Sequence, residues 1–264
     1  MMSLMRTFTP AMRMYRDMMA RIGKLPERRH MVAITFDDGN PSDYDAFKMM
    51  QERGCRGTSF IIGSRVREDD DPNPKNLTKS QIREMAASGW EIGCHTWTHP
   101  VSGEGLPGKP VNEIIDQIVT NKAFLEGLTG HPVLTHAIPG GKYDENLVNM
   151  YGAFFIGVRS SDGPGITYYG EWDRVYRARS TWMDYASRTV SSLKSAVDDF
   201  LAGDPGLLVI SGHSLRPEGP PDEGDHRLSL SELTEVVDHI VQYKKQGVLD
   251  VVTFAEGIFR IKIG

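Results

Sequence analysis

Cysteine is scarce in this sequence of 264 residues, with only two, Cys55 and Cys94. Two cysteines cannot supply the disulfide framework of a small secreted protein, and we interpret both as buried, reduced thiols. The N-terminus also lacks the uninterrupted apolar core of a secretory signal, because arginines interrupt it. These absences predict a cytoplasmic protein, unless a leader for export has been trimmed away.

Long apolar runs and clusters of basic residues are missing as well. No apolar run approaches the roughly 18 residues that a membrane crossing needs, so we expect no membrane span. The formal net charge is −5 and there is no long basic stripe. This charge distribution argues against nucleic acid as a partner.

What the sequence does contain is typical of one globular domain. Hydrophobic residues make up 39% of the chain and charged residues 25%, which predicts a packed core. The length favours a single large α/β domain, which we place at residues 30–264. Residues 1–29, which are rich in methionine and arginine, are expected to form a helical extension, with an amphipathic helix around 10–22. A subunit contact through this helix, and hence a homo-oligomer, is also compatible with the sequence.

Strand and helix signals alternate along the domain. Apolar or β-branched runs predict strands at 31–36, 58–62, 90–94, 132–138, 154–158, 175–178, 207–210 and 251–254. Helical periodicity and capping signals predict helices at 40–53, 78–89, 112–128, 143–151, 189–201 and 229–247. This order indicates βα units that build a largely parallel sheet or barrel.

Two adjacent carboxylates end the first predicted strand. Asp37, Asp38 and Gly39 follow its apolar run directly, at the end of a strand where α/β proteins bind their ligands. Neighbouring carboxylates repel each other, and they are tolerated where one binds a cation or the two share a proton. A surface turn is the alternative interpretation, and it would be preferred if the motif stood alone.

Two histidines follow the third predicted strand. His95 and His99 are four residues apart, a spacing that would place both imidazoles on one face of a helical turn. With Asp38 they make a set of two imidazoles and one carboxylate that leaves positions on a divalent metal ion open. A pair of surface histidines is the alternative, but the two strand ends taken together favour a metal site.

A late apolar run ends close to a further histidine, His213. In a βα barrel all these strand ends converge on one face. A metal ion held by Asp38 and the two earlier histidines would lower the pKa of a water molecule and polarise a carbonyl group. Asp37 would then accept the proton of the water, and a protonated His213 would supply one to the leaving group. The alternative for His213 is a core histidine that is hydrogen-bonded to the backbone.

These motifs resemble those of the NodB-type polysaccharide deacetylases (carbohydrate esterase family 4). The similarity lies in residues 35–39 (Thr-Phe-Asp-Asp-Gly), in residues 95–99 (His-Thr-Trp-Thr-His) and in His213, and it extends from about residue 31 to residue 254. The resemblance implies a distorted (β/α)7-type barrel and metal-dependent removal of acetyl groups, usually from N-acetylated sugars. It also implies Asp37 as the base, His213 as the acid, and Asp38 and the two histidines of the second motif as metal ligands.

The third motif of the family, Arg-x-Pro-x-Gly, is altered in this chain. It falls on residues 137–141 and begins with Ala137, so the arginine that braces the catalytic aspartate in the family is absent. His136 is expected to take its place or to make another polar contact in the cleft, with Arg159 and Arg179 as alternatives from other strands.

The walls of the predicted cleft come from later segments and from one loop. Backbone N–H groups near Gly140 and Gly141 are expected to serve as oxyanion donors, which requires no side chain. Asp162 is the acid available in the fourth motif, where the family carries the residue that orients the acid histidine. Residues 101–110, rich in glycine and proline, form a candidate wall of the cleft.

The leading hypothesis is a metal-dependent hydrolase that removes acetyl groups from an N-acetylated or O-acetylated carbohydrate. One alternative is hydrolysis of a small amide or a cyclic ureide, as in allantoinase-like relatives of this fold. The other is a non-catalytic, metal-containing glycan-binding protein. We expect one divalent ion, with zinc favoured, although iron, cobalt and nickel also suit these ligands.

Overall fold

The computed structural model describes residues 27–163, 165–184, 186 and 188–264. The amphipathic helix expected around residues 10–22 lies outside these residues. Across the described ranges, no helix combines the length and the apolar character that a membrane crossing requires.

The described residues form one sheet of nine strands, in the order β5-β4-β3-β2-β1-β8-β6, with β7 beside β8 and β9 beside β1. The strand bounds are β1 His30–Asp38, β2 Thr58–Ile61, β3 Glu91–Cys94, β4 Thr135–Ala137, β5 Gly157–Arg159, β6 Ile166–Tyr168, β7 Thr181–Trp182, β8 Gly206–Gly212 and β9 Leu249–Val251. Every pairing is parallel except that of β6 with β8. Because parallel strands are covered on both faces, β1 and β8 are almost continuously apolar and buried.

The sheet curls toward closure through the segment that leads into β7. Ala178 forms an isolated parallel bridge with Arg159 at the end of β5, and Thr181 pairs with Ile210 of β8. This segment therefore links the two sides of the distorted barrel that the sequence predicts. The strand expected at 175–178 does not form, because Val175 and Tyr176 belong to a 3-10 turn, η3 (Arg174–Tyr176), and Ala178 pairs only through the isolated bridge.

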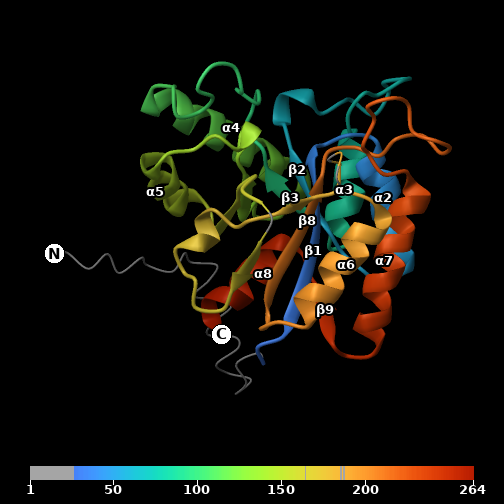
Figure 1. The fold of residues 1–264 in the computed structure, drawn as a ribbon. Coiled ribbons are helices and arrows are strands. Elements are labelled where there is room, and N and C mark those ends of the chain that lie inside the picture. Colours follow the sequence, from blue (N-terminus) through green and yellow to red (C-terminus); the bar gives the residue numbers. More distant parts are fainter. Residues whose placement is uncertain (1–26, 164, 185, 187) are drawn as a thin grey trace.

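Helices cover the outside of the sheet. Their bounds are α2 Ser42–Glu52, α3 Lys79–Ala87, α4 Val111–Thr129, α5 Glu145–Phe154, α6 Val190–Leu201, α7 Leu230–Lys245 and α8 Phe254–Ile263, and two further 3-10 turns are η1 Gly63–Arg65 and η2 Pro139–Gly141. In Figure 1, α2, α3, α6 and α7 lie on one side of the central strands β1 and β8, and α4 and α5 lie on the other. Capping boxes at Thr78 and Ser229 start α3 and α7 as predicted, since each side chain accepts a hydrogen bond from the third residue of its helix.

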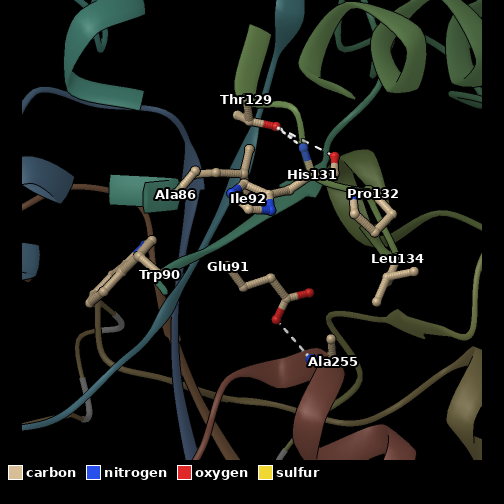
Figure 2. Close-up of a pocket in the computed structure, with 9 residues that line it drawn as sticks. All are labelled: Ala86, Trp90, Glu91, Ile92, Thr129, His131, Pro132, Leu134 and Ala255. Carbon is tan, nitrogen blue, oxygen red and sulfur yellow. Dashed lines mark hydrogen bonds between the residues drawn. The ribbon is translucent and has the colours of Figure 1, made fainter. Parts of the chain in front are cut away.

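Helix α8 packs against the amino-terminal ends of the strands. It was not predicted, because the β-branched run at 251–254 suggested a strand, whereas Phe254 is its first residue. The carboxylate of Glu91, at the start of β3, accepts hydrogen bonds from the backbone N–H of Ala255 (2.7 Å) and from the hydroxyl of Thr58 (2.9 Å). Figure 2 shows the hydrogen bond between Glu91 and Ala255 beside a small pocket. The carboxylate thus caps the N-terminus of α8, at the end of the barrel opposite to the carboxyl ends of the strands.

Candidate active site

Three predicted ligands meet at the carboxyl ends of β1 and β3. Asp38 is the last residue of β1, while His95 follows β3 and His99 lies in the next loop. The Oδ1 atom of Asp38 lies 3.5 Å from Nε2 of His95 and 3.7 Å from Nε2 of His99. One ligand atom from each residue falls within 4.8 Å of the others. The structure therefore brings the predicted set together.

The backbone around these ligands is held in left-handed conformations. Asp38, Thr96 and His99 have φ values of 76°, 64° and 58°, and they are the non-glycine residues with positive φ in the described part of the chain. Such residues are uncommon and cluster at functional sites. The loop is therefore irregular rather than the helical turn that the spacing of the histidines suggested. A hydrogen bond from the backbone N–H of His99 to the hydroxyl of Thr96 (3.1 Å) supports it.

The protonation states of these side chains fit a metal ion. The Nδ1 atom of His95 lies 2.9 Å from the carbonyl oxygen of Ala137, so this nitrogen donates and leaves the lone pair of Nε2 facing Asp38. Burial lowers the pKa of His95 to about 3, with a further contribution from nearby His99. Burial also lowers the pKa of His99. Both imidazoles are then neutral at physiological pH, which is the form that binds metals.

The acceptor atom of the carboxylate completes this fit. Oδ1 of Asp38 is buried and has no hydrogen-bond partner in the described part of the protein. Oδ1 of Asp38 thus faces Nε2 of both imidazoles, an arrangement that a divalent cation would stabilise.

Asp37 lies beside this centre and is paired with an arginine. The Nη2 group of Arg159 donates a hydrogen bond to Oδ2 of Asp37, and both residues are buried, at 2% and 1% exposure. Oδ2 also lies 3.9 Å from Nε2 of His95. The other oxygen, Oδ1, is buried and has no partner among the described residues. Arg159, at the end of β5, therefore pairs with Asp37 in place of the arginine that is missing from the third motif on β4.

His136 does not take that role, and this expectation is corrected. Its imidazole is fully buried and packs between Tyr151 and Phe155, with ring centroids 4.7 Å and 5.2 Å away. Burial lowers its pKa well below the usual value. His136 points toward α5 because successive side chains of a strand alternate between its faces. The backbone carbonyl oxygen of its neighbour Ala137 instead accepts the hydrogen bond from Nδ1 of His95, a candidate metal ligand.

His213 is oriented by an aspartate that the sequence did not single out. Its Nδ1 lies 2.7 Å from Oδ2 of Asp184, which also accepts the backbone N–H of His213 at 3.1 Å. The indole of Trp182 stacks on the imidazole, with centroids 4.9 Å apart and planes at 18°. Burial lowers the pKa of His213, but the hydrogen bond to Asp184 and the nearby carboxylate of Asp37 outweigh it, so that the pKa is raised. His213 is thus suited to carry a proton near neutral pH.

The carboxylate that binds Nδ1 of His213 belongs to Asp184, so the prediction that Asp162 orients His213 is wrong. The carboxylate of Asp162 accepts a hydrogen bond from the hydroxyl of Tyr143. The sequence feature that could have identified Asp184 is the Trp-x-Asp pattern at 182–184, which follows a short β-type run.

An open hollow is lined by loops that follow the carboxyl ends of β3, β4 and β5. Its lining comes from three loops and consists of Gly103, Glu104, Pro107, Gly141, Lys142, Tyr143 and Asp162. Part of the loop 101–110 therefore lines this hollow, and its role as a wall of the substrate cleft stays a prediction. The backbone N–H of Gly141, however, already donates to the carbonyl oxygen of Ile138 at 3.0 Å. This corrects its assignment as an oxyanion donor, whereas that of Gly140 stays a prediction.

Comparison with known proteins shows the family to which this chain is related. The family model described as Polysaccharide deacetylase matches residues 24–154. The chain belongs to the polysaccharide deacetylase family. A peptidoglycan-N-acetylglucosamine deacetylase of Bacillus cereus is 32% identical over 120 residues, which cover 45% of this chain and 50% of that protein. A bifunctional xylanase/deacetylase of Pseudobutyrivibrio xylanivorans is 25% identical over 235 residues, or 84% of this chain and 34% of that protein.

Solved structures show the same fold over a longer stretch. A family 4 acetyl xylan esterase from Clostridium thermocellum, in complex with cobalt, superimposes with a TM-score of 0.56 at 21% identity, covering 87% of this chain and 90% of that one. The chain spans only 22% to 50% of the length of three curated relatives that it matches. These comparisons therefore show the fold and the family of this chain, and they do not show its substrate.

Proposed function

We propose that this polysaccharide deacetylase family member is a metal-dependent hydrolase that removes acetyl groups from an N-acetylated carbohydrate. The observation that carries the proposal is the convergence of Asp38, His95 and His99, with a buried carboxylate on one side and a histidine of raised pKa nearby. A binding protein would need the ligands alone, whereas hydrolysis needs a proton acceptor and a proton donor as well.

The ligand set would hold one divalent ion, and we propose zinc, which two imidazoles and a carboxylate suit. When bound, such an ion supplies a Lewis acid that makes water more acidic and polarises the acetyl carbonyl group. Asp37 accepts the proton of the attacking water through Oδ1, because Arg159 occupies Oδ2. His213 donates its proton from Nε2 to the leaving amine nitrogen, because Asp184 holds Nδ1. The products are acetate and a free amino sugar.

Release of acetate from chitooligosaccharides by the zinc-loaded protein tests this proposal. Activity should disappear with a chelator and return with zinc. Asp37→Asn should lower kcat by roughly 10²- to 10⁴-fold, the usual contribution of a positioned base, while Asp198→Asn on the outer helix α6 should not. Zinc-loaded wild-type protein that releases no acetate from N-acetylated or O-acetylated sugars would refute the proposal.

The same assay separates the two alternatives, which the comparisons do not support. Turnover of allantoin-like rings without acetate release would indicate hydrolysis of a cyclic ureide. Glycan binding that is unchanged in Asp37→Asn and His213→Ala, without turnover, would indicate a non-catalytic binding protein.

A further inference from the structure

The turn η1 carries an arginine to the rim of the candidate metal centre. It directly follows β2, which lies between β1 and β3 in the sheet. The backbone N–H of Gly63 donates to the carbonyl oxygen of Thr96 (3.4 Å), and that of Ser64 donates to the carbonyl oxygen of Trp97 (3.0 Å). These bonds fix η1, and with it the backbone of Arg65, to the loop that joins the two histidine ligands.

The two oxygens of Asp38 face different partners. Oδ1 faces the imidazoles, at 3.5 Å and 3.7 Å, whereas Oδ2 lies 4.0 Å from Nη1 of Arg65. A separation of 4.0 Å is too long for a hydrogen bond. The guanidinium is thus held near the centre by charge, while its side chain stays 44% exposed. Its N–H donors therefore remain accessible to a bound molecule.

The balance of charge at this rim favours an anion. Each of the two aspartates has one arginine beside it, Arg159 for Asp37 and Arg65 for Asp38. The carboxylates and guanidiniums therefore cancel, and a divalent cation adds charge that no side chain of this group compensates. This local excess contrasts with the formal net charge of −5 for the whole chain.

We propose that Arg65 binds a carboxylate of the substrate, so that the preferred glycan is an acidic N-acetylated one. The inference rests on the proposed function, and it narrows the class of sugar. A guanidinium matches a carboxylate with two parallel hydrogen bonds, and a neutral glycan would leave these donors to water. The carboxylate could belong to the lactyl group of an N-acetylmuramic acid unit or to a uronic acid unit.

Binding measurements on zinc-loaded Asp37→Asn protein test the assignment without turnover. Calorimetry would compare three tetrasaccharides: chitotetraose, alternating N-acetylglucosamine and N-acetylmuramic acid, and alternating N-acetylglucosamine and glucuronic acid. At least one acidic sugar should bind more tightly than chitotetraose, and the two acidic arms identify the source of the carboxylate. Arg65→Gln should weaken binding of that sugar roughly tenfold to a hundredfold, the range for a hydrogen bond to a charged group, and Arg65→Lys by less.

Two controls accompany these variants. Binding of chitotetraose should change by less than about twofold in Arg65→Gln, because no charged bond is lost. Arg83→Gln removes an arginine of α3 with similar exposure, 52%, that pairs with Asp69 at 3.6 Å, and it should leave binding of all three sugars unchanged.

Equal affinity for neutral and acidic sugars in the Asp37→Asn protein would overturn the inference. So would no measurable binding of either acidic sugar, or an equal loss for all three sugars in Arg65→Gln. The proposed function fails separately: wild-type protein that releases no acetate but discriminates through Arg65 would refute hydrolysis and leave the anion site. Acetate release without discrimination would refute only the anion site.

Discussion

The buried ion pair between Arg159 and Asp37 leads to a quantitative prediction about stability. Replacing Arg159 by methionine keeps an unbranched side chain and removes the charge, which leaves the carboxylate of Asp37 at 2% exposure without its partner. Removing one member of a buried pair typically costs about 3–5 kcal/mol. For a chain of this size, that corresponds to a fall in Tm of roughly 6–20 °C.

Removing both charges should be less harmful than the two single changes suggest. Asp37→Asn alone leaves the guanidinium unpaired, so it should also destabilise the protein. The double variant contains two neutral groups, and its cost should fall below the sum of the single costs by about 2 kcal/mol or more, because residues in direct contact couple strongly.

Urea unfolding of chelator-treated protein is the assay, since bound metal would otherwise add to the measured stability. Arg83→Met is the matched control and should cost less than about 1 kcal/mol, because its ion pair is exposed. Single costs that add to within about 0.5 kcal/mol would show that the two charges do not depend on each other, and the reasoning would fail.

Three further predictions concern the acid, the metal and the rim of the hollow. Asp184→Asn should lower the pKa of His213, because the carboxylate of Asp184 raises that pKa. Activity that needs the protonated imidazole is lost as pH rises, so the alkaline limb of the pH–rate profile should move to lower pH. NMR titration of the imidazole ring should show the same fall in the pKa. His99→Ala should weaken zinc binding, measured by competition with a chromogenic chelator, by more than the roughly 10–100-fold that loss of a ligand-orienting partner costs; an unchanged affinity would remove His99 from the site. Gly141→Ala should destabilise the protein clearly more than Gly170→Ala in urea, because both have positive φ (67° and 91°) but only the first would place a Cβ 1.6 Å from a serine hydroxyl; equal costs would contradict this.

Two members of the candidate ligand set, Asp38 and His95, could be predicted because they lie at the ends of recognisable apolar runs. β1 is buried on both faces and reads as an unbroken apolar run that stops at Asp37 and Asp38. His95 follows a shorter run in the same way. Residues at the ends of parallel strands converge whatever the details of the register, so these positions required no three-dimensional information.

The supporting residues could not be assigned in this way, because their strands are too short to show a pattern. β4 has three residues, so nothing in the sequence fixes which of His136 and Ala137 faces the barrel, and a shift of one residue exchanges the faces. β7 has two residues, and Asp184 follows it at a distance of 29 residues from His213. Arg159 was one of two arginines considered, and only the position of β5 distinguishes it from Arg179.

The position of α8 has a consequence for the order in which the protein can assemble during synthesis. This helix packs against residues of β5 and β8, since a Cβ on Gly157 would meet Ile258 and one on Gly257 would meet Leu207. Emergence of residues 30–213 from the ribosome supplies every proposed catalytic group, yet the base of the barrel stays uncovered until residues 254–263 follow. We therefore expect nascent chains that stop before α8 to depend on chaperones and to acquire protease resistance only once that helix has docked.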